Sequence, residues 1–191
     1  MTENRNGRSK HRKLCNKVPR LEIAEIRQLA HGVRDILSSF PRFNKTEVPI
    51  AELLDRLRDT GQIEFQLVEQ HELPNEYAVS YPDKKCIKCR ETVYNNALAG
   101  QARDRFTLAH ELGHILLHQN INPMFARSQS VSFHHFTEDA EWQANAFASE
   151  FLVDSRMVES SMTPRDISKL FGVSFEAAGY IYDRFKKENL I

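Results

Sequence analysis

Residues 106–118 have the sequence F-T-L-A-H-E-L-G-H-I-L-L-H, in which His110, Glu111 and His114 form the pattern H-E-x-x-H. Residues four apart lie on one face of a helix, one turn above the other. Two imidazoles at this spacing can bind one ion, and the carboxylate that follows the first lies where it can act on a bound water molecule. A zinc hydrolase needs these parts. The stretch therefore predicts a helix that carries a metal site.

The apolar residues around the motif predict that this helix is buried. Leu108, Leu112 and Ile115, together with the two leucines that follow, give it apolar coverage on more than one side. The alternative is a buried core helix that carries two histidines by chance. Buried Glu and His side chains cost free energy unless they are paired or coordinated, however, which favours the metal interpretation.

The composition is that of one globular domain. The chain has 191 residues, of which 41% are hydrophobic and 27% are charged. No apolar run approaches the roughly 18 residues that cross a bilayer, and the basic N-terminus lacks the apolar stretch of a secretory signal. Three cysteines, an odd number, argue against a disulfide framework. We expect a cytoplasmic protein with no membrane partner.

The first 20 residues carry a strong positive charge. They contain seven Lys or Arg and one acidic residue, although the whole chain has 26 residues of each sign. Such a segment cannot bury enough apolar surface to fold alone, so we expect residues 1–18 to form a basic, disordered tail. A solvated tail without a specific role and a tail that makes weak contact with nucleic acid both fit this composition.

Two helices and three strands are predicted ahead of the motif. Apolar residues recur at helical spacing over 19–40 and over 49–58. Apolar and polar residues then alternate, which predicts strands over 63–67, 77–81 and 86–94. Because these strands follow one another along the chain, we expect a small antiparallel sheet. Polar connections are expected before and after the motif helix, over 95–105 and 119–136.

Cys86 and Cys89 form a C-x-x-C pair in the third predicted strand. A structural zinc site would need a second pair, and Cys15 is the one cysteine left. A redox pair would lie at a strand-to-helix turn rather than within a strand. We therefore interpret both residues as ordinary thiols.

A catalytic zinc ion usually takes three protein ligands, so the third must lie outside the H-E-x-x-H pattern. His118 lies two turns from His110, about 12 Å along the axis, and cannot reach the same ion without distorting the helix. We expect it at the helix end, beside the site. The metzincin pattern is excluded because positions 117 and 120 are Leu and Asn instead of Gly and His. The remaining candidates are His134 with His135, and an acid on the next helix.

The next predicted helix, over 138–151, carries such an acid. Glu141 lies on the same face as Ala144 and Phe151, which is a packing face and not a solvent face. A carboxylate there needs a cationic partner, and a zinc ion would be one. It would complete a His2Glu site of the thermolysin class. The alternative is an ion pair with an arginine such as Arg127.

The two motifs together resemble those of the ImmA/IrrE family of bacterial metallopeptidases. R-F-T-L-A-H-E-L-G-H-I-L-L-H at 105–118 and E-W-Q-A-N-A-F-A at 141–148 match its pattern, H-E-x-x-H followed by E-x-x-A-N. The order of the predicted elements over 19–191 is also similar. One departure is L-V-D at 152–154, where the family often has a proline, and it concerns the end of that helix alone.

The resemblance implies a zinc cofactor with His110, His114 and Glu141 as its ligands and Glu111 as the catalytic base. Asn145 falls on the asparagine of the family motif, where we expect it to support a ligand or the helix. The resemblance also implies a protein substrate, a helix-turn-helix transcriptional repressor. Cleavage of this repressor would derepress a phage, mobile-element or stress-response operon.

The C-terminal segment, residues 161–191, predicts two short helices. Thr163 and Asp166 begin the first as cap and first-turn acid, Gly172 ends it, and Ser174 begins the second. The pair resembles a helix-turn-helix. Its acidic residues offset its basic ones, so we expect it to pack against the rest of the chain, with contact to DNA or a partner as the alternative.

Together these patterns predict an α+β protein with a zincin-like metallopeptidase domain over 19–160, between the tail and the C-terminal segment. We expect a zinc-dependent endopeptidase in which Glu111 takes a proton from water and passes it to the leaving amine. For the residue that stabilises the oxyanion, His134 and His135 are the candidates. The alternative is a DNA-binding or adaptor protein with a structural metal. A structural zinc site has four protein ligands and no need for Glu111, which argues against it.

Overall fold

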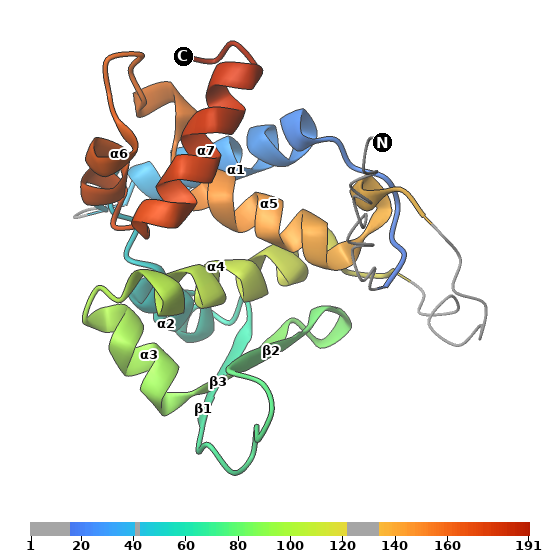
Figure 1. Ribbon diagram of the computed structural model, residues 1–191. Coiled ribbons are helices and arrows are strands. Elements are labelled where there is room, and N and C mark those ends of the chain that lie inside the picture. The colour runs from blue at the N-terminus through green and yellow to red at the C-terminus, as the bar shows by residue number, and fades with distance from the viewer. Residues whose placement is uncertain (1–15, 41–42, 122–133) are drawn as a thin grey trace, which may run out of the picture.

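A computed structural model describes residues 16–40, 43–121 and 134–191 and shows the expected α+β architecture (Figure 1). Within these ranges the chain forms seven α-helices and one three-stranded sheet, and none of these helices is long and apolar enough to cross a bilayer. The elements follow the chain in the order α1 (Ile23–Ser38), α2 (Ile50–Asp59), β1 (Glu64–Val68), β2 (Ala78–Tyr81), β3 (Cys86–Arg90), α3 (Glu91–Leu98), α4 (Ala102–Leu117), α5 (Ala140–Leu152), α6 (Pro164–Phe171) and α7 (Phe175–Lys187).

α4, the helix of the H-E-x-x-H motif, lies at the centre of the molecule, between the sheet and α5 (Figure 1). Its side chains Leu108 and Ile115 are at most 2% exposed, as the sequence predicted. α5 packs closely against it, because a Cβ added at Gly113 would lie 3.0 Å from Phe147 Cδ1 and 3.3 Å from Ala144 Cα. This close approach brings side chains of the two helices to one site.

The sheet is mixed, which corrects the prediction of an antiparallel sheet. Its strand order is β1-β3-β2, with β3 parallel to β1 and antiparallel to β2. β1 and β2 are consecutive in the chain but lie on opposite sides of β3. Alternating polarity shows that a strand has one buried face, and it does not show which strand lies beside it. β2 forms one edge of the sheet and packs against α4.

β3 ends earlier than the strand predicted over 86–94, and α3 follows it directly. The predicted connection over 95–105 consequently contains the end of α3 and the start of α4. Val93 and Ala97 lie four residues apart and are buried on one face of α3. So short an apolar pattern does not distinguish a helix from a strand, which explains the error.

Cys86 and Cys89 are buried, free thiols, as predicted. They lie three residues apart in a strand and therefore point to opposite faces of the sheet, so they cannot pair with each other. Burial, together with the charge of Glu111, raises the pKa of Cys89 to about 12. A thiol with such a pKa is protonated and unreactive at neutral pH. Cys15 lies outside the described residues.

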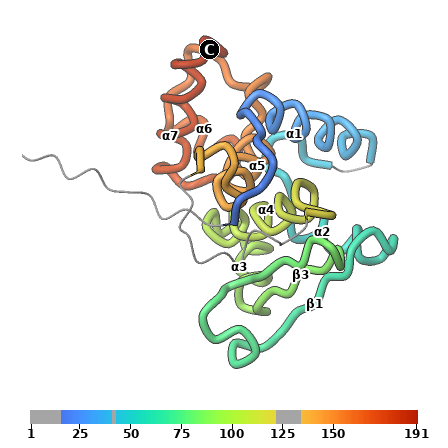
Figure 2. Tube along the Cα trace, turned by 90° about the vertical axis from the view of Figure 1, so that its right-hand side faces the viewer, coloured from blue at the N-terminus to red at the C-terminus, as the bar shows by residue number. Residues whose placement is uncertain are grey.

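Residues 16–18, which we expected at the end of a disordered tail, lie against the start of α5 (Figure 2). Lys17 forms a β-bridge with Asp139, and the backbone N of Val18 donates to the carbonyl oxygen of Glu138 at 2.8 Å. Val18 is buried, so this segment belongs to the fold. The rest of the predicted tail, residues 1–15, lies outside the described residues.

α6 and α7 form where two C-terminal helices were predicted, and both are held by the rest of the molecule. The guanidinium of Arg105 on α4 donates to the carbonyl oxygen of Phe171, at the end of α6, at 3.2 Å. Arg184 of α7 lies 2.9 Å from the buried carboxylate of Glu150 on α5. The expected packing is confirmed, and contact with DNA or a partner stays a prediction.

Candidate metal centre

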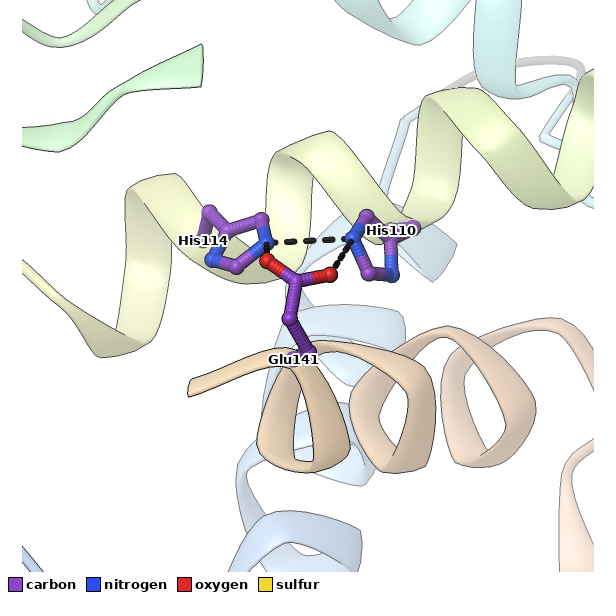
Figure 3. A group of neighbouring side chains, drawn as sticks. All are labelled: His110, His114 and Glu141. Carbon is purple, nitrogen blue, oxygen red and sulfur yellow. Dashed lines mark hydrogen bonds and ion pairs between the residues drawn. The ribbon is translucent and has the colours of Figure 1, made fainter. Parts of the chain in front are cut away.

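The three side chains predicted as metal ligands converge between α4 and α5 (Figure 3). His110 and His114 extend from adjacent turns of α4, and their Nε2 atoms lie 3.0 Å apart. Glu141 reaches them from the first turn of α5. Its Oε2 lies 3.3 Å from His110 Nε2, and its Oε1 lies 3.3 Å from His114 Nε2. Two nitrogen atoms and one carboxylate therefore face a common point.

The spacing of these atoms fits a tetrahedral zinc ion. Zinc binds imidazole nitrogen at about 2.0–2.1 Å, so two ligand atoms of a tetrahedral site lie roughly 3.3 Å apart. The nitrogen–nitrogen distance of 3.0 Å and the two nitrogen–oxygen distances of 3.3 Å agree with this value. Among the described residues, these three form the one group of His, Cys, Asp and Glu side chains that could hold a metal ion.

The charges of the cluster also suit a cation. Hydrogen bonds with His110 and then with His114 hold the pKa of Glu141 well below its usual range, against the effect of burial. Burial disfavours a charge on His110, but the hydrogen bond with Glu141 and the charges of Glu111 and Glu141 together raise its pKa. A carboxylate that stays ionised beside two imidazoles supplies the negative charge that a divalent cation attracts.

Glu111 lies beside this group. Glu111 is 8% exposed and borders the same cleft as the two histidines. Within the part of the chain that the structure describes, its carboxylate makes no ion pair or hydrogen bond. A carboxylate that is nearly buried and has no partner among the described residues is available to bind a water molecule and accept its proton.

His118 lies at the C-terminal end of α4, as predicted, and its ring contacts the ring of His114. The Nδ1 atoms of the two rings lie 2.9 Å apart, and Nε2 of His118 lies 3.1 Å from Oε1 of Gln143 on α5. Burial, and then the neighbouring His114, lower the pKa of His118 to about 4. The sequence interpretation missed Gln143. Its signal was an amide four residues before Phe147, on a buried face of the helix.

Asn145 supports the other histidine. Its Oδ1 lies 3.1 Å from Nδ1 of His110, on the side of the ring away from Glu141. A histidine that binds a metal through one ring nitrogen commonly donates its other N–H to such an oxygen, which orients the ring. The contact agrees with the supporting role expected for Asn145.

The cluster lies in a cleft of about 480 Å³. Residues 78–80 of β2 and residues 16–18 line this cleft together with His110, Glu111 and His114. Successive side chains of a strand point to opposite faces. Because three consecutive residues of β2 line the cleft, the backbone edge of this strand borders it.

His134 and His135 are not among the described residues that border the cleft. His135 Nδ1 lies 2.7 Å from the hydroxyl of Thr137, and His134 Nε2 lies 3.5 Å from Asp139. These positions do not support either histidine as a metal ligand or as the group that stabilises an oxyanion. Arg127, the alternative partner for the ligand glutamate, lies outside the described residues.

Comparison with known proteins identifies a family. The family model Peptidase_M78, described as the IrrE N-terminal-like domain, matches residues 60–181. This range begins after α2 and contains the H-E-x-x-H motif, Glu141 and Asn145. No curated protein and no solved structure matches the chain.

Proposed function

The chain belongs to the peptidase family of the IrrE N-terminal-like domain, and from this premise we propose that it is a zinc-dependent endopeptidase. His110, His114 and Glu141 would hold the ion, and Glu111 would be the catalytic base. The proposal is carried by one observation: these donor atoms converge at zinc-ligand spacing in a cleft that Glu111 borders. Membership of the family supports a metal-dependent peptidase, and two histidines with one glutamate are the ligand set of catalytic zinc in peptidases of the thermolysin class.

The chemistry would be divided among these residues. Zinc, when bound, supplies Lewis-acid polarisation of the peptide carbonyl and of a water molecule. Glu111 accepts a proton from the water whose oxygen attacks the carbonyl carbon, and it donates this proton to the amine nitrogen as the C–N bond breaks. Asn145 orients His110, and the negative charge of Glu141 offsets part of the charge of the ion.

A protein substrate would fit the cleft as an extended strand. β2 pairs with β3 along one edge, and its other edge borders the cleft. The free edge of a strand can add an extended peptide through backbone hydrogen bonds. Such binding uses the backbone within a chain and does not need a chain end, which suits an endopeptidase.

The proposed substrate is a helix-turn-helix transcriptional repressor, whose cleavage would derepress a phage, mobile-element or stress-response operon. This proposal rests on the resemblance of the two motifs to the ImmA/IrrE family.

A DNA-binding protein with a structural metal is less well supported. A structural zinc site has four protein ligands, and the described residues bring three together.

Glu111→Gln tests the mechanism, because glutamine keeps the size of the side chain but cannot accept the proton. We expect the variant to bind zinc as the wild type does and to cleave candidate repressors from the same locus at least about 100-fold more slowly. Cleavage would be followed by mass spectrometry after equal zinc content is shown. Glu91→Gln, on the exposed first turn of α3, is the control and should cleave normally.

Equal cleavage by wild type and Glu111→Gln would rule out the proposed mechanism. If no repressor is cleaved and the protein instead binds DNA with an affinity that falls steeply with salt, the DNA-binding alternative gains support.

A further inference from the structure

His114 is connected to the segment ahead of α1 by a continuous line of polar contacts. Its Nδ1 lies 2.9 Å from Nδ1 of His118, and Nε2 of His118 lies 3.1 Å from Oε1 of Gln143. The Gln143 amide nitrogen then donates to the carbonyl oxygens of Pro19 and Thr137, each at 2.7 Å. We call His118 and Gln143 the relay.

The two carbonyl groups fix the orientation of the Gln143 amide. A carbonyl oxygen accepts hydrogen bonds and cannot donate one, so the group that faces Pro19 and Thr137 has to be the NH2. The amide oxygen therefore faces His118. Gln143 and Thr137 are each 1% exposed, so solvent does not compete for these contacts. Thr137 also accepts from the backbone N of Leu21 at 3.0 Å, which holds the acceptor in place.

This orientation selects the tautomer of His118. An amide oxygen is an acceptor, so the ring nitrogen that faces it, Nε2, carries the hydrogen. A neutral imidazole has one N–H, and Nδ1 of His118 therefore keeps a lone pair and accepts from Nδ1 of His114. The hydrogen of His114 then lies on Nδ1, and its Nε2 keeps the lone pair. That atom is the one that faces Glu141, at 3.3 Å.

We propose that His118 and Gln143 are positioning residues that hold His114 in the tautomer able to bind the metal through Nε2. This inference rests on the proposed metal centre, in which His114 is a ligand. A ligand histidine commonly donates its second N–H to a carboxylate, a backbone carbonyl or water. Here the acceptor is another histidine, and it accepts because the amide behind it takes its own N–H. The carbonyl of Pro19 thereby makes the segment ahead of α1 part of the support for the site.

The tautomers of His114 and His118 can be observed directly in the wild-type protein. Long-range ¹H–¹⁵N correlation spectra of the metal-free full chain should show His114 protonated on Nδ1 and His118 protonated on Nε2. In Gln143→Leu, the Nε2–H of His118 loses its acceptor, and His118 should show a mixture of both tautomers. A wild-type His118 that is protonated on Nδ1 would overturn the relay.

Zinc affinity tests the consequence for the metal centre, with Zn²⁺ in competition with a chromophoric chelator as the probe. Gln143→Leu and His118→Phe are expected to bind Zn²⁺ about 10- to 100-fold more weakly than the wild type. His118→Asn keeps an oxygen that can accept from His114, so it should bind more tightly than His118→Phe. Thr163→Ala removes the helix cap of α6, away from the cleft, and controls for a general loss of stability. Its affinity should equal that of the wild type.

The failure of the relay and the failure of the metal centre give different results. If the wild type binds Zn²⁺ no more tightly than His114→Ala, the proposal of the metal centre is wrong, and the proposal of the relay is wrong as well. If the wild type binds tightly and both Gln143→Leu and His118→Phe match it, the metal centre stands and the relay is overturned. Equal losses for His118→Phe and His118→Asn would also overturn it, because the acceptor would then have no effect.

Discussion

Arg27 of α1 and Glu150 of α5 form a bidentate ion pair in the interior of the molecule. Arg27 donates from Nε and Nη2 to the two carboxylate oxygens at 2.9 and 3.0 Å, and the Glu150 side chain is 0% exposed. Arg184 of α7 lies 2.9 Å from the same carboxylate, and Glu188 lies 2.6 Å from Arg27. This network ties α1 and α7 to the helix that carries the proposed ligand Glu141.

Replacement of Glu150 should destabilise the whole fold. Glu150→Gln leaves Arg27 and Arg184 without their buried counter-charge, and the removal of one partner from a buried pair costs about 3–5 kcal/mol. Urea denaturation measures this loss in the free energy of unfolding. Glu176→Gln, on the exposed start of α7, should change the same quantity by less than about 0.5 kcal/mol. An equally small change for Glu150→Gln would contradict the structural role of the pair.

Gly113 allows α4 and α5 to lie close together, and an added methyl group should push them apart. A Cβ there would lie 3.0 Å from Phe147 Cδ1 and 3.2 Å from the carbonyl oxygen of Ala144. The backbone of a packed helix cannot move aside easily, so we expect Gly113→Ala to lower the free energy of unfolding by about 1–3 kcal/mol. Zn²⁺ binding should weaken as well, because Glu141 would shift relative to the histidines. Thermal unfolding and zinc titration measure the two effects.

Gly32 provides the matched control for this substitution. It lies inside α1, and among the described residues an added Cβ would meet no heavy atom within 4 Å beyond its own stretch of the helix. Gly32→Ala should therefore raise the free energy of unfolding by about 0.4–1 kcal/mol, because alanine reduces the freedom of the unfolded chain. Opposite signs for the two substitutions would identify packing as the cause. The same stabilisation at both glycines would show that α4 and α5 are not in close contact at Gly113.

The positions of the two histidines in the metal centre could be predicted, because the geometry of a helix depends only on the spacing of its residues. The H-E-x-x-H spacing places His110 and His114 on adjacent turns whatever surrounds them, and their Nε2 atoms do converge. Glu141 follows His114 by 27 residues, but it could be placed near them from its position on a packing face. The Glu141 side chain is 46% exposed, so its place beside the histidines follows from the face of α5 on which it lies and not from a need to neutralise a buried charge.

Relationships made by the backbone could not be predicted from side-chain patterns. β3 lies between β1 and β2, although the alternation in each strand fits an antiparallel order equally well. Val18 joins the fold through its backbone N–H, a donor that every residue except proline carries. Gln143 likewise owes its orientation to two backbone carbonyls, those of Pro19 and Thr137. The sequence shows that an amide lies on a buried face of the helix, but not which backbone carbonyls it contacts.

Asn145 should contribute to metal affinity through His110. Asn145→Leu removes the oxygen that faces His110 Nδ1, and the loss of such a partner weakens metal binding by about 10- to 100-fold. Asn145→Asp keeps an acceptor and should bind Zn²⁺ at least as tightly as the wild type. Asn96→Leu, on the exposed side of α3, controls for the added apolar surface. Isothermal titration calorimetry measures the affinities, and an unchanged affinity in Asn145→Leu would exclude this role.

The fold should lose stability in acid, because protonation of Asp154 removes a charge that stabilises it. Asp154 lies 3.1 Å from Nε of Arg34 and 2.8 Å from Nη2 of Arg156, and its side chain is 5% exposed. Burial alone would raise its pKa, but hydrogen bonds from Arg156 and the charge of Arg34 lower the pKa of Asp154 to about 2. Because this value lies below that of the unfolded chain, the contribution to stability is complete above about pH 4 and is lost as the pH falls toward about 2. At neutral pH it amounts to about 2 kcal/mol.

Asp154→Asn tests this dependence, since asparagine keeps the shape of the side chain but has no carboxyl group that titrates. At neutral pH the variant should unfold with about 2 kcal/mol less free energy than the wild type. The difference should shrink as urea denaturation is repeated at lower pH, because the wild type loses the charge that the variant lacks. Asp183→Asn, on the exposed side of α7, should follow the wild type at every pH. A deficit in Asp154→Asn that stayed constant down to about pH 2 would mean that Asp154 stabilises the fold through its hydrogen bonds and not through its charge.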